Sequence, residues 1–119
     1  RVGSEMCIRE GLGVLGQLDP AATTVTVLYT VPDKTQTTVS SIVAANRTGS
    51  AITFRLSVHV AGASANDKQF LYYGKSVAAN DSLTIVIGIT LNQTDVIKVH
   101  TSAVDMSFNI FGCETTEER

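Results

Sequence analysis

The sequence has little charge and few residues that bend or cross-link a chain. Of its 119 residues, 17% are charged and 6% are aromatic, with two prolines, two cysteines and no tryptophan. A hydrophobic fraction of 44% and a formal net charge of −2 exclude an intrinsically disordered chain, which combines low hydrophobicity with high net charge. The length suits one folded domain, since most domains have about 50–250 residues.

Clusters of basic residues and long apolar runs are also absent. The lysines and arginines are scattered singly along the chain, whereas nucleic-acid-binding proteins gather them on one face. No run of about 18 apolar residues occurs, so no membrane-spanning helix is expected. The opening stretch RVGSEMCIREGLG lacks the basic and apolar regions of a signal peptide. The sequence therefore predicts neither nucleic acid nor a membrane as a partner.

Glutamate is missing from the whole interior of the chain, from Gly11 to Cys113. Most aspartates of this interior stand beside residues typical of turns, where a short carboxylate hydrogen-bonds its own backbone. Strands are depleted in Glu and Asp and enriched in Val, Ile, Thr and aromatic residues. This distribution indicates a β-rich domain with its charge in the turns and at the ends.

Alternating or apolar segments separated by turn residues predict seven strands. These are residues 24–31, 37–45, 52–60, 69–77, 83–91, 96–101 and 106–113. Alternation predicts that Val25, Val27, Tyr29 and Val31 share one face, as do Phe54, Leu56, Val58 and Val60. Seven short strands without a helical segment predict an all-β fold, an antiparallel β-sandwich of jelly-roll or immunoglobulin-like type.

The chain divides into three parts. Residues 1–22 are rich in glycine and predict an extended N-terminal arm or an edge strand. Residues 23–113 form the predicted β-sandwich domain, and residues 114–119 form an acidic C-terminal tail. Within the sandwich, Gly88 interrupts an apolar strand and predicts a bulge or a close backbone approach.

No residue pattern predicts catalysis, a metal or a cofactor. His59 and His100 are the only histidines, and both fall on the polar side of a predicted strand, where an exposed or interface position is expected. Neither has a cysteine or carboxylate at ligand spacing, and a zinc site needs three or four converging ligands. The nucleophile motif G-x-S-x-G is missing as well. We expect a non-enzymatic protein.

Cys7 and Cys113 lie in the two terminal segments and have two interpretations. A disulfide between them would join the N-terminal arm to the last strand and contribute roughly 2–4 kcal/mol in an oxidising compartment. Two ordinary thiols are the favoured interpretation, because no export signal is visible and disulfides are uncommon in the cytosol.

A series of short motifs extends from Leu15 to Glu114. They are Leu15-Gly16-Gln17, Pro20-Ala21-Ala22, Leu28-Tyr29-Thr30-Val31-Pro32, Ser40-Ser41-Ile42, Asn46-Arg47, Thr53-Phe54-Arg55, Gly62-Ala63, Asp67-Lys68-Gln69, Tyr72-Tyr73, Asn80-Asp81, Gly88-Ile89-Thr90-Leu91, Asp95-Val96-Ile97 and Ser107-Phe108-Asn109-Ile110-Phe111-Gly112. In order and spacing, the chain resembles a family of small virion structural proteins of tailed bacteriophages of aquatic bacteria. The resemblance implies a place in the phage particle, with assembly in the host cytoplasm.

Several predicted strands carry apolar residues on both faces, although a lone antiparallel sandwich commonly has polar outer faces. The candidate residues for an oligomer or lattice interface are Leu28, Phe70, Tyr72, Tyr73, Val86 and Phe111. Apolar surface of this kind is buried in obligate oligomers. We expect a homo-oligomer, and a homotrimer is the leading hypothesis.

These observations lead to three hypotheses for function. The first is a capsid decoration or cement protein that binds across capsomers, with the major capsid protein or another virion protein as its partner. The second is a structural protein of the tail, baseplate or fibre. The third belongs to a different class, a carbohydrate-binding sandwich in which Tyr72, Tyr73 and loop residues near Asn66 bind host-surface glycans.

Overall fold

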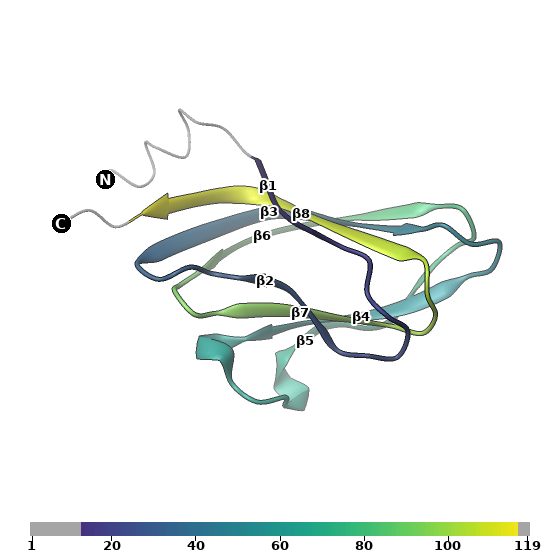
Figure 1. Cartoon of the computed structure of the whole chain (residues 1–119), viewed down its shortest axis with the longest axis horizontal. Helices are drawn as coiled ribbons and strands as arrows, with labels where there is room; N and C mark the ends of the chain where they lie inside the picture. Colours follow the sequence, from purple (N-terminus) through teal and green to yellow (C-terminus); the bar gives the residue numbers. More distant parts are fainter. Residues whose placement is uncertain (1–12, 117–119) are drawn as a thin grey trace.

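The computed structural model describes residues 13–116, which fold into eight strands in two antiparallel sheets (Figure 1). The strands are β1 (Gly13–Leu18), β2 (Thr26–Thr30), β3 (Thr35–Asn46), β4 (Ile52–His59), β5 (Phe70–Val77), β6 (Ser82–Leu91), β7 (Val96–Thr101) and β8 (Met106–Thr116). Two short 3-10 turns, η1 (Val60–Gly62) and η2 (Asp67–Gln69), lie between β4 and β5.

Each sheet contains four strands. Sheet A has the order β1-β8-β3-β6, and sheet B has the order β2-β7-β4-β5. Every connection between successive described strands crosses from one sheet to the other, except the one from β4 to β5. The two-sheet, eight-stranded arrangement is that of a jelly roll. The predicted antiparallel sandwich is therefore confirmed, with eight strands in place of seven.

The additional strand comes from the segment interpreted as an arm. Residues Gly13–Leu18 pair with β8 at the edge of sheet A, so the alternative of an edge strand is correct for this part. At the other end, β8 continues to Thr116 and takes in the start of the predicted tail. Residues 1–12 of the predicted arm and 117–119 of the predicted tail lie outside the described residues.

The core lies between the two sheets and contains side chains from both. Its largest fully buried members are Phe54, Phe108, Ile42, Ile52, Leu56, Ile97, Met106 and Ile110. Phe54 of sheet B meets Phe108 of sheet A edge to face, with 5.7 Å between the ring centroids. Burying one such side chain contributes about 1.5–3 kcal/mol, so this layer is the main source of stability.

A β-bulge in β2 changes which of its side chains face the core. The register with β7 shifts between Val27 and Tyr29. As a result Leu28 and Tyr29 are both buried, whereas Val25 and Val27 are exposed. The predicted common face of Val25, Val27, Tyr29 and Val31 is therefore wrong for its first two members. Strict alternation ends wherever a strand inserts an extra residue.

The bulge predicted at Gly88 is present. Val39 and Ser41 of β3 pair with Ile89 and Val86 of β6, so three steps along β6 match two along β3. Gly88 lies within this interval and has a φ of +56°. Glycine adopts this left-handed conformation without the penalty that a Cβ atom imposes.

A hydrogen-bonded group joins the two sheets near the end of β8. The Tyr29 hydroxyl, from sheet B, donates to Oε2 of Glu114 at 2.5 Å and lies 2.8 Å from Oγ1 of Thr37, both from sheet A. Burial raises the pKa of Tyr29, and the hydrogen bond to Glu114 raises it further. The folded state therefore favours the neutral phenol.

We predict that Tyr29 makes the protein lose stability as the pH rises above about 10, the ordinary pKa of tyrosine. The folded state binds the phenolic proton more tightly than the unfolded chain, so its contribution is complete below that pH and is lost above it. In Tyr29→Phe this part of the alkaline loss should disappear, and unfolding at neutral pH should cost about 1–3 kcal/mol less. Urea unfolding across this pH range measures both effects, and an equally steep alkaline loss in the variant would implicate another group.

A second prediction concerns the close approach of β8 to β3 at Gly112. A Cβ atom at this position would lie 2.1 Å from the carbonyl oxygen of Thr38. Because that neighbour is backbone, Gly112→Ala should destabilise the protein by at least about 1–3 kcal/mol. Gly13→Ala is the matched control, since a Cβ there meets nothing within 4 Å. Equal urea midpoints for the two variants would contradict the prediction.

Candidate functional site

The six predicted interface residues do not form one surface, and two of them belong to the core. Leu28 is buried, because the β2 bulge turns it inward beside Tyr29. Tyr72 is partly buried and packs against Phe54, with 5.9 Å between the ring centroids. The prediction of an outward Leu28 is wrong, and Tyr72 mainly supports the core.

Val86 and Phe111 lie together on the outer side of sheet A. Register partners across the sheet place Val14, Phe111, Ser41 and Val86 in one row that crosses all four strands. Val86 is 84% exposed, and Val14 at the opposite edge is also exposed. Sequence reasoning missed Val14, because only its pairing with β8 places it beside Phe111.

A second row lies next to the first and is mostly polar, without a charged residue. It contains Gln17, Asn109, Val43 and Thr84, again one residue from each strand. The Gln17 side-chain amide donates to Oδ1 of Asn109 at 2.7 Å. We call these two rows the neutral face of sheet A.

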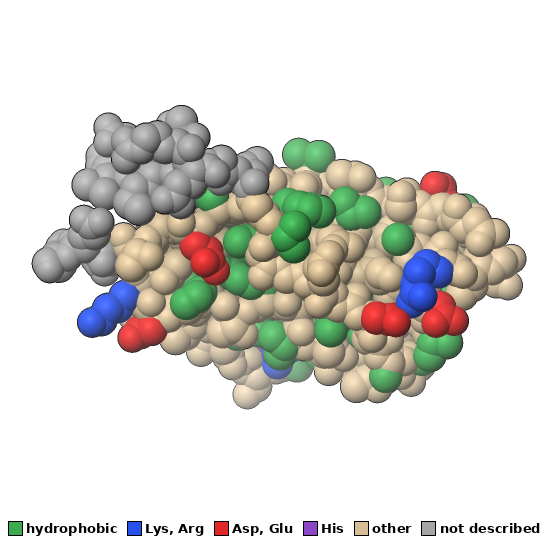
Figure 2. Space-filling model, turned by 45° about the horizontal axis from the view of Figure 1, so that its top comes forward, with side chains coloured by type: hydrophobic (Ala, Val, Ile, Leu, Met, Phe, Trp, Pro, Cys, Tyr) green, Lys and Arg blue, Asp and Glu red, His purple; other side chains and the backbone are tan. Residues whose placement is uncertain are grey.

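Charge is almost absent from this sheet. Strands β1, β3 and β6 contain no charged residue, and β8 contains only Glu114, whose carboxylate accepts the Tyr29 hydrogen bond. On the side of the molecule shown in Figure 2, most charged side chains gather toward the two ends, with uncharged and hydrophobic surface between them. The neutral face therefore lacks the charge that commonly solvates an outer sheet face.

Sheet B has the opposite character. Its strands contain Arg55, Lys75 and Lys98 and no aspartate or glutamate. Arg55 pairs with His100 on β7 and with Tyr73 on β5, so these three side chains form one row. Cζ of Arg55 lies 4.3 Å from the centroid of the Tyr73 ring.

Lys98 adjoins this row on the same side of sheet B. It lies two residues before His100 on β7 and pairs with Ser57 of β4, two residues after Arg55. Residues two apart on a strand share one face of the sheet. We call Arg55, Tyr73, Lys98 and His100 the basic face.

The residues proposed for glycan binding do not form a common platform. Tyr72 and Tyr73 are neighbours on β5 and point to opposite sides, as successive strand residues do. Tyr73 is 63% exposed, while Tyr72 packs on the core. Oδ1 of Asn66 accepts a hydrogen bond from the Lys68 backbone N–H, so this side chain holds the η2 turn.

The fold also brings a serine and a histidine together. Oγ of Ser57 lies 2.9 Å from Nε2 of His59, and Nδ1 of His59 lies 2.9 Å from the carbonyl oxygen of Ala63. Because a carbonyl oxygen only accepts, Nδ1 of His59 donates to Ala63, and the hydroxyl of Ser57 forms a hydrogen bond with the other ring nitrogen. Ser57 is only 6% exposed and His59 only 2%, so neither side chain is open to a substrate.

This pair corrects one prediction from the sequence. His59 is buried rather than exposed or at an interface, because the chain after β4 turns back and places Ala63 against its ring. His100, in contrast, remains partly exposed on sheet B. We interpret the Ser57–His59 pair as a structural support for the η1 turn.

A shallow hollow at one end of the sandwich is lined by Ala45, Asn46, Arg47, Asn80, Asp81 and Ser82. Its Asn46 and Arg47 side chains are engaged within the protein. The Asn46 amide donates to the carbonyl oxygens of Ser50 and Val77 at 2.8 and 3.0 Å. Arg47 forms an ion pair with Asp19 at 2.9 Å. We therefore interpret the hollow as a place where hydrogen bonds and an ion pair join neighbouring loops, and not as a binding site.

Among residues 13–116, no group of three or more His, Cys, Asp or Glu side chains is placed to hold a metal ion. Within this range no helix is long and apolar enough to cross a membrane.

Cys113 is disulfide-bonded in the structure. The favoured interpretation of an ordinary thiol is therefore wrong for this residue, because no local sequence pattern shows which side chains the fold brings near it. Cys113 pairs with Thr38 and alternates with Glu114, whose carboxylate reaches the other sheet. Its side chain consequently points to the outer side of sheet A. Cys7, the other cysteine of the sequence, lies outside the described residues.

We predict that the purified protein contains no reactive thiol until it is reduced. Denatured without reductant, the chain should resist alkylation, and after reduction it should take up one alkyl group on each of its two cysteines. Mass spectrometry measures the uptake, and non-reducing electrophoresis separates a bond within one chain from a bond between copies. Alkylation of both cysteines without reduction would contradict the prediction.

Comparison with known proteins shows similarity in fold but not in sequence. No family model and no curated protein matches the chain. One solved structure, described as "Bacillus endospore appendages form a novel family of disulfide-linked pili", is similar with a TM-score of 0.56 and 15% identity. The similarity covers 91% of this chain and 88% of that chain. At this identity the comparison shows a shared β-sandwich fold alone.

Proposed function

We propose that this protein is a non-enzymatic structural subunit of a phage particle, a decoration or cement protein that binds across capsomers. The virion assignment rests on the resemblance of the motifs between Leu15 and Glu114. The observation that carries the role in assembly is the neutral face of sheet A, which has no outward charged side chain on any of its four strands. The cores of protein interfaces are depleted in charge in the same way.

The dimensions of the neutral face suit a contact between subunits. Four strands about 4.8 Å apart, with roughly eight residues of 3.4 Å each, give the whole outer side of sheet A, to which the neutral face belongs, a flat area on the order of 500 Å². One side of a standard interface buries about 800 Å², so this face with its rim provides most of one contact. Full burial of a valine contributes about 1.5–3 kcal/mol, and exposed valines stand at both edges of the face.

The proposed partners are the major capsid protein or another virion protein, together with further copies of this chain. In a homotrimer, each copy would cover part of the neutral face of its neighbour. The remaining part would then bury backbone and apolar surface against the capsomers. Stabilisation of the head follows, because separating two capsomers would expose this surface to water.

A charge placed in the neutral face tests the proposal. Val86→Glu should weaken self-association or particle binding at least about tenfold, because the interface would bury an unpaired carboxylate. The sandwich itself should stay folded, since Val86 points away from the core. Val104→Glu is the matched control, an exposed valine in the β7–β8 loop outside the neutral face. Light scattering on the isolated protein and binding to particles that lack it measure the two effects.

Three outcomes would contradict the proposal. They are a wild-type monomer that binds no particle, equal losses for Val86→Glu and Val104→Glu, and absence of the protein from purified virions. Electron microscopy of labelled particles shows where in the particle the protein lies. Hundreds of copies on the head support decoration, whereas a few copies at the tail would overturn it in favour of a baseplate or fibre component.

A further inference from the structure

We propose that the basic face of sheet B binds an acidic polysaccharide. In this arrangement Arg55 and His100 hold a carboxylate of the sugar, and the part of the Tyr73 ring that Arg55 leaves exposed packs against the sugar ring. Lys98 pairs with a neighbouring acidic group. This binding site is separate from the neutral face and does not depend on the assembly proposed above.

Arg55 is held in a defined position while its donors stay available. Its guanidinium lies over the Tyr73 ring at 4.3 Å, and Tyr73 is itself held edge to face by Phe70, with 4.9 Å between centroids. A stacked guanidinium keeps its planar set of N–H donors, which matches the two oxygens of a carboxylate. The loss of side-chain freedom on binding is therefore small.

The cations of this face have no anionic partner in the part of the chain that the structure describes. Both ion pairs found there belong to Arg47, which directly follows the last residue of β3. The strands of sheet B contain no carboxylate at all. Arg55 lies directly beside His100. Lys98 lies two residues before His100 on β7, about 6.8 Å from it along the strand. Uncompensated positive charge at this spacing favours an anionic ligand.

The position of the basic face favours a polysaccharide over a peptide. Arg55 lies on β4, and Lys98 and His100 lie on β7, which are the two inner strands of sheet B. Extended peptides commonly bind sheets by adding to an edge strand through main-chain hydrogen bonds. A ligand that crosses inner strands must instead be held by side chains, as a chain of flat sugar rings is.

The electrostatics disfavour nucleic acid. The chain has a net charge of −2, and the face has only two permanently charged side chains. Affinity for nucleic acid grows with the number of phosphates that a protein neutralises. Two cations neutralise few phosphates and therefore add little affinity. An exposed aromatic ring beside a few cations suits a ligand with an apolar ring face and dispersed carboxylates.

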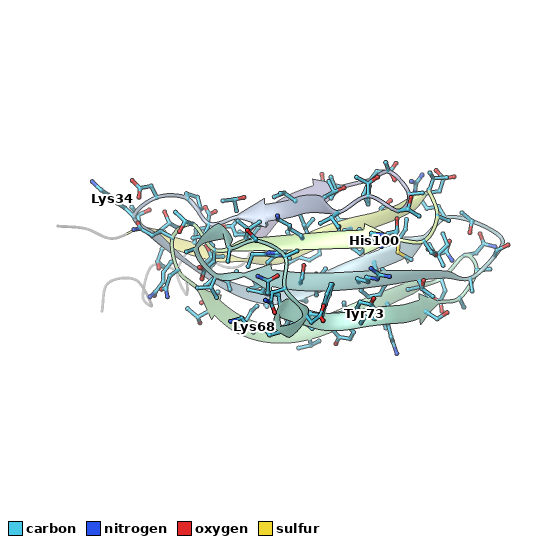
Figure 3. All side chains as sticks on the ribbon, turned by 90° about the horizontal axis from the view of Figure 1, so that it is seen from below. Lys34, Lys68, Tyr73 and His100 are labelled. Atoms are coloured by element: carbon cyan, nitrogen blue, oxygen red, sulfur yellow. The ribbon has the colours of Figure 1, made fainter. Side chains whose placement is uncertain are left out.

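Figure 3 looks onto sheet B and places His100 and Tyr73 over the same half of the sheet. Lys34, in the turn between β2 and β3, lies at the far end of the molecule in this view. A subunit attached through the outer side of sheet A would leave sheet B facing away from the attachment. Lys34 provides a charged position outside the proposed site for comparison.

Calorimetric titration of the full chain with galacturonate oligosaccharides tests the proposal, at about 50 and 150 mM salt because screening weakens charge pairs. We expect saturable binding that Arg55→Gln and Tyr73→Ala each weaken about tenfold or more. Arg55→Lys should also lose most of the affinity, because it keeps the charge but loses the planar donors. Lys34→Gln should bind like the wild type. Lys98→Gln changes a cation outside the stacked Arg55–Tyr73 pair and should bind about threefold more weakly than the wild type. Circular dichroism verifies that each variant is folded.

Several results would overturn the proposal. One is the absence of saturable binding to the oligosaccharides, or equal binding to their uncharged methyl esters. Another is an equal loss in Lys34→Gln, which would indicate an effect of overall charge. Tighter binding of poly-glutamate or of DNA, with the same dependence on Arg55 and Tyr73, would assign the face to an acidic peptide or to nucleic acid. The assembly variant Val86→Glu should keep full affinity for the sugar, so a failure here is distinguishable from a failure of the proposed assembly.

Discussion

The pairing of β3 with β8 is the constraint on which the rest of the structure depends. The ladder extends from Thr35 opposite Thr116 to Asn46 opposite Met106. These strands are the two inner members of sheet A, with β1 attached to β8 and β6 attached to β3. Because the last strand lies beside the third, sheet A forms only after most of the chain is in place. Such non-local pairing pays its loop-closure entropy before its contacts form, which makes folding of all-β domains slow.

Three successive residues of β8 show how much this ladder supports. Gly112 lets the backbone of β8 approach that of β3, with no room for a Cβ atom. Cys113 points outward and is disulfide-bonded. Glu114 points inward and accepts the hydrogen bond from Tyr29 of the other sheet. The alternation of a β-strand thus directs three kinds of link to two sides within three positions.

The two sheets share one core but differ on their outer sides. Sheet A presents uncharged rows that suit burial against protein, and sheet B presents cations and an exposed aromatic ring without acids. A thin sandwich makes this division possible, because successive residues of every strand belong to opposite surfaces. Packing constrains the residues on the core side of each strand. The outward residues are not constrained in this way, so they can be suited to binding a partner.

The sequence by itself determined the approximate extent of seven of the eight strands. Seven predicted strands correspond to β2–β8, with ends that differ by at most three residues, because alternation and turn residues are local signals. It also placed the carboxylates in turns and near the two ends, whereas Arg55, Lys75 and Lys98 lie within strands of sheet B. Only the tertiary structure decided that a glycine-rich segment becomes β1, that Leu28 turns inward at a bulge, and that His59 is buried. It alone set the row in which Ser41 lies between Val86 and Phe111, and the row in which Arg55 lies beside Tyr73. The physical reason is that neighbours across a sheet are chosen by the register of strands distant in sequence, and no local pattern carries that register.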